Sequence, residues 1–313
     1  MIEKQLGSAQ TEAELAIEAV LKRMPQWQAQ DLTYAPLVGG IMNGNWRITV
    51  EGDRRRYFVK IPGAGSEKFI DRKAAHQAAK NAHAMGIGPE VVYFDPEEGV
   101  EAFEFLEGYR ACTNSDFRDP DIQLSVIELY RKFNAGAPLP LTKTVFDMID
   151  EHFAQARERG SHLPSDFAWI ERRYEEAKAA MIASGLDLVC CFNDPMPGNF
   201  LIKPGESMKL IDCEFASNNE RAYELGVFIG EMFYPEDCSL ELIESYYGSV
   251  KPAIVARVNV ARCLADIKWA SWAIVNRKLS SWDFDYQKYG AWKYMRARAQ
   301  LFDPRWESWL RKL

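Results

Sequence analysis

The sequence contains no hydrophobic run that approaches the ~20 residues of a membrane-spanning helix. Its first residues combine no basic segment with an apolar core, so we expect neither a secretory leader nor insertion into a membrane. Histidine is scarce, with four copies, and the six cysteines form no C-x-x-C pair, which argues against a zinc site. The sequence also lacks internal repeats and low-complexity tracts.

The chain also has no excess of basic residues. The chain has 38 Lys and Arg against 45 Asp and Glu, a formal net charge of -7, which disfavours nucleic acid or an anionic membrane as the main partner. A hydrophobic content of 47% is typical of a globular protein, and 313 residues support one large or two medium domains. Cys190, Cys191 and Cys213 lie in apolar segments, so we expect buried, reduced thiols and a cytoplasmic location.

The first third of the chain predicts a small antiparallel sheet with helices. Apolar residues alternate around a turn at residues 51–53, which indicates a hairpin, and an Ala-rich segment that ends at Gly86 indicates a helix. The expected strands are residues 46–50, 56–61, 91–94 and 100–106, and the expected helices are residues 12–24 and 71–85.

Helical periodicity dominates from residue 122 onward, apart from strand-like segments within residues 188–215. The expected helices are residues 122–134, 145–158, 166–184, 222–233, 240–247, 254–277 and 286–301. Residues 104–107 are the expected linker. We therefore predict an α+β fold with an N-terminal lobe over residues 1–106 and a larger, mainly helical C-terminal lobe over residues 107–313.

The most informative feature is Asp194, which precedes Asn199 by five positions and Asp212 by eighteen. The apolar residues 188–189 and 210–211 predict short strands that present both acidic segments on loops. This series suits phosphoryl transfer from a nucleotide: the first Asp accepts the proton of the substrate hydroxyl, and the Asn and the second Asp hold Mg²⁺ against the phosphates. Each residue by itself fits equally well as a turn or loop-capping residue.

A possible nucleotide loop precedes this series. Gly39, Gly40 and Asn43 lie in a strand–turn–strand setting, where glycines let the backbone approach phosphates and exposed N–H groups bind them. Lys60 ends a strand of apolar and aromatic residues, from which a lysine can reach nucleotide phosphates. Either feature alone is weak, but their order before the Asp–Asn–Asp series favours a phosphotransferase.

These motifs resemble those of the choline/ethanolamine kinases, within the aminoglycoside-phosphotransferase-like group, and most of all the bacterial choline kinases. The resemblance covers about residues 37–301. It is carried by Gly39, Gly40 and Asn43, by Val59 and Lys60, by residues 70–72 and 86–89, by Asn193, Asp194, Asn199 and Phe200, by residues 210–216, and by Trp269 and Trp272. The resemblance implies a bilobal protein-kinase-like fold, with a small antiparallel-sheet N-terminal lobe and a larger helical C-terminal lobe.

The resemblance also implies the activity, which is ATP-dependent phosphorylation of a small amino alcohol, choline or ethanolamine. It makes Asp194 the catalytic base, and it makes Asn199 and Asp212 the Mg²⁺ ligands. The residues that it assigns to ATP are Gly39, Gly40, Asn43, Lys60, Glu104 and Leu106, the last two beside the adenine. The implied partners are a nucleotide and a small-molecule substrate, and a homodimer is compatible with this family.

The C-terminal aromatic residues bear on the choice of acceptor. Trp269 and Trp272 share a helix face, and aromatic faces attract quaternary ammonium groups by about 0.5–2 kcal/mol each. The spacing alone fits core packing as well. The resemblance implies that Trp269, Trp272 and Tyr289 line a head-group pocket, with Phe215 and Glu231 as further candidates. Glu231 would either offset the ligand's charge or pair with a local arginine.

Three positions depart from the family pattern. Phe192 and Asn134 stand where the family has histidines, and Ala75 stands where a helix glutamate pairs with the strand lysine. We expect the aromatic ring of Phe192 to support the loop, and we expect Lys60 to lack its usual partner. Two alternatives stay open. One is a phosphotransferase for an aminoglycoside or a sugar, and the other is a nucleotide-binding pseudokinase that acts as a regulator or scaffold.

Overall fold

The computed structural model describes residues 3–28, 30–37, 43–63, 70–279 and 284–313. The chain divides into two compact units, Met1–Ala111 with Phe200–Glu214 and Cys112–Asn199 with Phe215–Leu313. The first unit carries an antiparallel sheet and the second is mainly helical, so the predicted α+β fold with two lobes is confirmed.

Six strands in the described part of the first unit form one antiparallel sheet in the order β1-β2-β3-β4-β6-β5. They are β1 (Lys4–Gln5), β2 (Leu32–Pro36), β3 (Asn43–Val50), β4 (Arg56–Pro62), β5 (Val91–Phe94) and β6 (Glu101–Glu104). The alternating pattern correctly predicts the β3–β4 hairpin. Gly52 in its turn has a φ of +82°, a conformation that glycine adopts at no steric cost. The register pairs Asn45 of β3 with Lys60 of β4.

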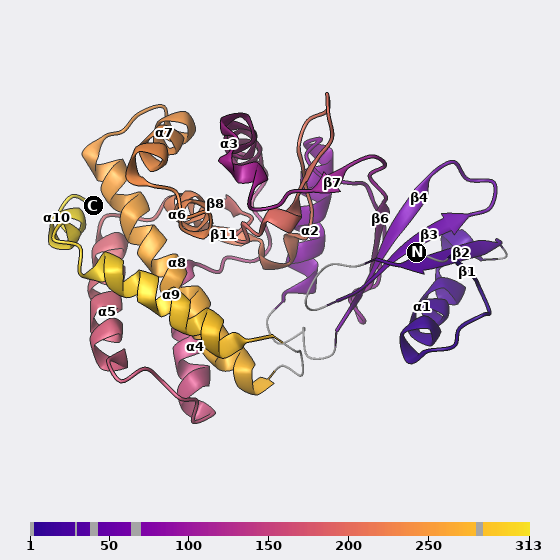
Figure 1. Cartoon of the computed structure of the whole chain (residues 1–313), viewed down its shortest axis with the longest axis horizontal. Helices are drawn as coiled ribbons and strands as arrows, with labels where there is room; N and C mark the ends of the chain where they lie inside the picture. Colours follow the sequence, from indigo (N-terminus) through magenta and orange to yellow (C-terminus); the bar gives the residue numbers. More distant parts are fainter. Residues whose placement is uncertain (1–2, 29, 38–42, 64–69, 280–283) are drawn as a thin grey trace. The chain divides into compact units, whose positions relative to one another are not determined.

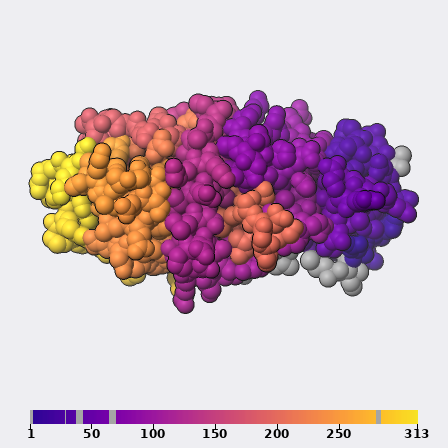
Figure 2. Space-filling model, turned by 90° about the horizontal axis from the view of Figure 1, so that it is seen from above, coloured from indigo at the N-terminus to yellow at the C-terminus, as the bar shows by residue number. Residues whose placement is uncertain are grey.

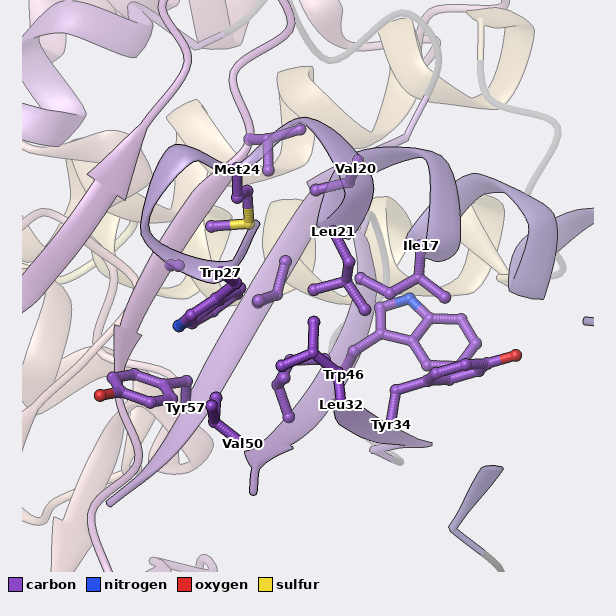
Figure 3. Packing of buried hydrophobic residues seen from close by; sticks show 14 residues of the cluster. Ile17, Val20, Leu21, Met24, Trp27, Leu32, Tyr34, Trp46, Val50 and Tyr57 are labelled. Carbon is purple, nitrogen blue, oxygen red and sulfur yellow. The ribbon is translucent and has the colours of Figure 1, made fainter. Parts of the chain in front are cut away.

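Two helices complete this unit. The helix α1 (Glu12–Arg23) begins with a capping box, in which the Thr11 hydroxyl accepts the Glu14 N–H and the Glu14 carboxylate accepts the Thr11 N–H. Its apolar face packs on the sheet through the side chains drawn in Figure 3. Each aliphatic side chain buried there contributes about 1.5–3 kcal/mol to stability. The Ala-rich helix α2 (Arg72–Ala84) follows an Asp71 cap, close to the predicted bounds.

The segment Phe200–Glu214 belongs to the first unit, although it is distant in sequence. It contributes to a three-stranded sheet in the described residues, made of β10 (Lys209–Leu210), β9 (Phe200–Ile202) and β7 (Arg110–Ala111). The Leu210 N–H also donates to the carbonyl of Ile87 at 2.6 Å. Figure 2 shows this segment as orange-red atoms among purple ones. The sequence-based division after residue 106 does not anticipate this excursion, which brings the Asp212 segment into the unit that contains Lys60.

Helices make up most of the second unit (Figure 1). They are α3 (Pro120–Asn134), α4 (Val145–Glu158), α5 (Phe167–Ala183), α6 (Arg221–Glu231), α7 (Glu236–Tyr247), α8 (Pro252–Leu279), α9 (Tyr286–Leu301) and α10 (Trp306–Leu310). Periodicity correctly predicts the first seven of these, and the largest difference is α7, which begins at Glu236 rather than at residue 240. None of the helices in the described ranges combines the length and apolar character that a membrane span requires.

The helix α8 is the core of this unit, and it packs along α6 and α9 (Figure 1). A Cβ on Gly226 of α6 would lie 2.7 Å from the backbone nitrogen of Arg262 in α8, so only glycine permits this close crossing. Most α8 residues between Ala256 and Asn276 are buried, among them Lys268. Because α8 is covered on nearly every side, polar residues on it need partners within the protein or from a ligand.

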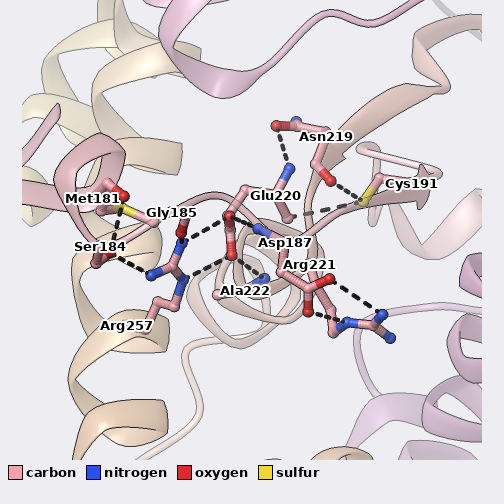
Figure 4. A network of polar contacts seen from close by, with 10 residues as sticks. All are labelled: Met181, Ser184, Gly185, Asp187, Cys191, Asn219, Glu220, Arg221, Ala222 and Arg257. Atoms are coloured by element: carbon pink, nitrogen blue, oxygen red, sulfur yellow. Dashed lines mark hydrogen bonds and ion pairs between the residues drawn. The ribbon is translucent and has the colours of Figure 1, made fainter. Parts of the chain in front are cut away.

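A short antiparallel pair, β8 (Leu188–Cys191) and β11 (Ser217–Glu220), supports the loop that carries Asp194. Figure 4 shows how this pair is tied to α8: the Glu220 carboxylate accepts hydrogen bonds from Arg257 Nε at 2.8 Å and Arg257 Nη2 at 3.0 Å. Glu220 is buried, so the arginine is required to compensate its charge.

Candidate active site

The loop after β8 has a left-handed residue, Asn193, whose φ is +68°. Two backbone N–H groups of this loop donate to the buried carboxylate of Glu224 on α6, from Phe192 at 2.6 Å and from Asn193 at 3.0 Å. Burial raises the pKa of Glu224 to about 7, although these hydrogen bonds act in the opposite direction. Sequence reasoning missed Glu224, whose only signal is an acidic residue inside an otherwise apolar helix.

The Asn193 side chain fixes the same loop from the other side. Its Nδ2 donates to the Phe215 carbonyl at 2.8 Å and to Ser217 Oγ at 2.9 Å, and its Oδ1 accepts from Asn219 Nδ2 at 2.9 Å. Asn193 is fully buried. A left-handed residue held by this many contacts is the kind of strained position that clusters at functional sites.

Asp194 follows directly, and its carboxylate is largely buried, with 8% of the residue exposed. Asn199 Nδ2 donates to Asp194 Oδ2 at 3.2 Å, which confirms that the spacing of five brings the two side chains together. Burial raises the pKa of Asp194 to about 6, whereas the charge of Lys268 and the Asn199 hydrogen bond lower it. A carboxylate with this pKa is a stronger base than ordinary Asp and is still ionised at neutral pH.

Two of the departures from the family pattern lie beside this loop. Phe192 is buried and packs edge-to-face on Phe133 at 6.3 Å between ring centroids, in agreement with the expected supporting role. Asn134 at the end of α3 donates to the Cys190 carbonyl at 2.7 Å and to Glu224 Oε2 at 3.2 Å. Both residues therefore stabilise the loop by packing or hydrogen bonds.

Lys60 in the first unit lacks the helix glutamate of the family pattern, because residue 75 is alanine, but three other carboxylates surround it. Its Nζ lies 2.8 Å from Glu214 Oε1, 3.5 Å from Glu101 Oε2 and 3.5 Å from Asp212 Oδ1. Burial would lower the pKa of Lys60, but these three acids raise it above its usual value. The missing glutamate at Ala75 is replaced by acids from β6 and from the segment after β10, a substitution that only the tertiary structure reveals.

Asp212 lies next to this lysine in a left-handed conformation, with φ +64°. Its side chain is 35% exposed, whereas those of Glu101 and Glu214 are nearly buried, so Asp212 is the acid of this group that an ion can reach. No group of three or more His, Cys, Asp or Glu among the described residues could hold a metal ion by itself. Mg²⁺ usually takes only one or two carboxylates together with water and phosphates, and Asp212 fits that requirement.

The other predicted nucleotide residues also belong to the first unit. Gly39 and Gly40 lie outside the described residues. Asn43 begins β3, and its Nδ2 donates to Glu214 Oε1 at 2.9 Å, so it shares an acceptor with Lys60. Glu104 ends β6, and Leu106 follows it, half-buried.

The predicted head-group residues come together in the second unit as one aromatic cluster, defined here as Phe215, Trp269, Trp272 and Tyr289. Consecutive rings pack edge-to-face, with centroid distances of 5.5 Å, 5.5 Å and 6.2 Å. Trp269 and Trp272 are 7% and 8% exposed, so most of their surface is covered by the protein. The cluster is therefore part of the packed interior, and its role in binding a substrate stays a prediction.

Charged residues accompany these rings. Glu231 forms an ion pair with Lys293, not with the arginine that we considered, and the Lys293 ammonium lies 5.1 Å from the centroid of Tyr289. Lys268 places its ammonium 3.0 Å from the centroid of Trp269. Neither lysine was a predicted site residue, although Lys268 directly precedes Trp269 in the sequence.

Comparison with known proteins agrees with this geometry. The sequence model of choline/ethanolamine kinase matches residues 34–250. This chain belongs to the choline/ethanolamine kinase family. The family membership that the resemblance implies is thereby confirmed.

Three members of this family show the range of similarity. A choline/ethanolamine kinase family protein from Mesorhizobium loti has a TM-score of 0.82 and 26% identity, over 96% of this chain and 98% of its own. The choline kinase LicA from Streptococcus pneumoniae has a TM-score of 0.77 and 19% identity, over 93% and 99%. Ethanolamine kinase 2 of Rattus norvegicus is 21% identical over 314 residues, which cover 89% of this chain and 79% of that protein.

Proposed function

We propose that this choline/ethanolamine kinase family member transfers the γ-phosphoryl group of ATP to the hydroxyl of a small amino alcohol, with choline and ethanolamine as the first candidates. The observation that carries the proposal is the Asp194 carboxylate, which is buried and accepts a hydrogen bond from Asn199. Hydrogen bonds of Glu224 and Asn193 fix the loop that carries it. A base needs this kind of fixed position to act on a single hydroxyl.

In the proposed reaction, Asp194 Oδ accepts the hydroxyl proton while the hydroxyl oxygen attacks the γ-phosphorus. The bond between that phosphorus and the oxygen bridging to the β-phosphate breaks, and the electron pair leaves with ADP. The pKa of Asp194, raised to about 6, favours proton uptake near neutral pH. The hydrogen bond from Asn199 keeps the carboxylate oriented.

The nucleotide would be held by residues of the first unit. Lys60 is the proposed contact to the phosphates, and its three carboxylate neighbours keep it charged. Glu104 and Leu106 are the proposed contacts to adenine, with Asn43 near the phosphates. In support, a solved structure of LicA, which has a TM-score of 0.74 against this chain, is a complex with AMP.

Asp212 and Asn199 would hold Mg²⁺. Asp212 offers a partly exposed carboxylate. Asn199 donates a hydrogen bond from its side-chain N–H to Asp194, which leaves its side-chain oxygen as the amide atom suited to a cation. When bound, Mg²⁺ neutralises charge on the phosphates. A homodimer, which is compatible with the family, and a cytoplasmic location, expected from the cysteines, stay predictions.

Release of ADP over a panel of acceptors tests the proposal. We expect turnover that depends on Mg²⁺ with choline or ethanolamine, and a loss of about 10²–10⁴-fold in Asp194→Asn, with nearly unchanged nucleotide binding and melting temperature. An aminoglycoside in the panel tests the second acceptor class. Nucleotide binding without turnover of any acceptor would favour the pseudokinase, and equal turnover by wild type and Asp194→Asn would exclude Asp194 as the base.

The head-group role of the tryptophans has its own test. Trp272→Ala should raise the KM for the amino alcohol a few-fold to about thirty-fold while the KM for ATP stays close to unchanged, because one cation–π contact is lost. If Trp272 serves packing alone, the variant should lose several degrees of melting temperature with no selective change for the amino alcohol.

A further inference from the structure

Lys268 lies within the aromatic cluster, and the reaction described above makes no use of it. The residue is 2% exposed, and its Nζ has no hydrogen-bond partner in the described part of the chain. The ammonium faces two rings, at 3.0 Å from the centroid of Trp269 and 5.0 Å from that of Phe215. A buried ammonium without a hydrogen bond is costly, so its presence here calls for an explanation.

The second lysine beside the cluster, Lys293, forms an ion pair, whereas Lys268 forms none with the described residues. Lys293 is paired with Glu231, the acid that was expected to offset the charge of a cationic acceptor. Among the described residues, no carboxylate oxygen lies within 4.0 Å of Lys268 Nζ, the distance at which an ion pair forms. Asp194 acts on Lys268 at longer range, but as the base it must take up the hydroxyl proton. Within the described residues, the Lys268 amine therefore lies in the cluster with no hydrogen-bond acceptor of its own.

When Lys268 is protonated, its positive charge repels an acceptor whose only charge is positive. The Lys268 ammonium already lies over the Trp269 ring that would receive the head group of choline or ethanolamine. A second cation would have to share the aromatic surface with it, and two like charges in a poorly solvated site repel each other strongly. A carboxylate at the same place would instead supply the missing hydrogen-bond acceptor for Nζ.

We propose that the preferred acceptor is a hydroxylated amino acid, whose hydroxyl faces Asp194, whose ammonium group faces the remaining aromatic surface, and whose carboxylate binds Lys268 Nζ. The inference rests on the proposed phosphoryl transfer and specifies its acceptor. It keeps the amino alcohol of the family and adds one anionic group, which this chain's own lysine recognises.

The electrostatics of the site support this assignment. Burial lowers the pKa of Lys268 well below its usual value, while the Asp194 charge raises it and the Lys143 and Lys293 charges lower it further. A bound carboxylate would counter the effect of burial and keep the ammonium charged. Hydrogen bonds between two charged groups are also shorter and about twice as strong as neutral ones.

The test compares three acceptors that share a primary hydroxyl and a vicinal amine: serine, serine methyl ester and ethanolamine. In the wild type we expect kcat/KM for serine to exceed those for the ester and for ethanolamine by about 10- to 100-fold, as expected for a hydrogen bond to a charged group. Lys268→Met should lower kcat/KM for serine to the level of the ester. Met has a similar length and no charge, so it should pack on Trp269 without a folding penalty.

Lys278→Met is the matched control, because Lys278 is an exposed lysine on the same helix and, among the described residues, donates to the carbonyls of Arg159 and Gly160. It should leave the order of the three acceptors unchanged. The comparison of serine with its ester in the wild type needs no variant, so it stands even if Lys268→Met folds poorly.

Two outcomes would overturn the inference. One is a kcat/KM for serine that does not exceed that of the ester. The other is a Lys268→Met enzyme that gains activity on choline and loses none on serine, which would make Lys268 an internal substitute for the substrate cation. If no acceptor is phosphorylated, the proposed function has failed, and the role of Lys268 is tested by ligand binding instead. Serine should then raise the melting temperature of the wild type but not that of Lys268→Met, and serine methyl ester should raise neither.

Discussion

Replacement of Asn193 tests how the catalytic loop is held. Asn193→Ala removes the partners of the partly buried Phe215 carbonyl and of the buried Asn219 Nδ2, whereas Ser217 keeps a hydrogen bond to the Lys143 carbonyl. Each buried polar group left without a partner costs about 1–3 kcal/mol, so both together cost about 2–6 kcal/mol.

The backbone of Asn193 adds a second, separable effect. At φ +68°, alanine is strained by about 1–2 kcal/mol, whereas glycine is not. Glycine normally destabilises a folded chain by about 0.5–1 kcal/mol relative to alanine. At this position the order should therefore reverse, and Asn193→Gly should be the more stable variant by up to about 1.5 kcal/mol.

The assay is urea unfolding followed by tryptophan fluorescence, together with release of ADP. Both variants should unfold at lower urea than the wild type and lose kcat, because Asp194 is the next residue. Asn114→Ala, at an exposed turn residue, serves as the control and should match the wild type. An Asn193→Ala protein as stable as Asn193→Gly would refute the backbone argument, and wild-type stability in both would refute the hydrogen-bond argument.

Three further predictions concern the base, the lysine and the metal ligand. Because burial raises the pKa of Asp194 to about 6 and the base must be ionised, kcat/KM should fall about tenfold per pH unit below pH 6 and level off above it; a flat profile from pH 5 to 8 would contradict this. Ala75→Glu should leave ATP affinity unimproved and lower the melting temperature, because Lys60 already has three acids and residue 75 is buried; a gain in ATP affinity would show that Lys60 is poorly oriented. Asp212→Ala should weaken nucleotide binding more with Mg²⁺ than without it, and equal affinities in titrations under both conditions would leave Asp212 as a structural residue.

The parts of this protein that depend on local sequence were predictable. Hydrophobic periodicity predicts helices such as α4 and α9 with the bounds that the structure shows, because a helix buries one face at a fixed spacing. The pairing of Asp194 with Asn199 was equally accessible, since five residues in one loop suffice to bring the two side chains together.

The tertiary structure decided what depends on contacts between distant residues. Glu224 holds the loop from 31 positions away, and Glu214 reaches Lys60 across 154 positions, so no local pattern announces either contact. The same holds for the charge in the aromatic cluster. The sequence determined that two tryptophans share a helix face, but only the packing of α8 and α9 showed that Lys268 lies on Trp269 while Lys293 neutralises Glu231. Periodicity specifies which face of a helix is buried, whereas the partner of a buried charge is set by whichever element packs against it.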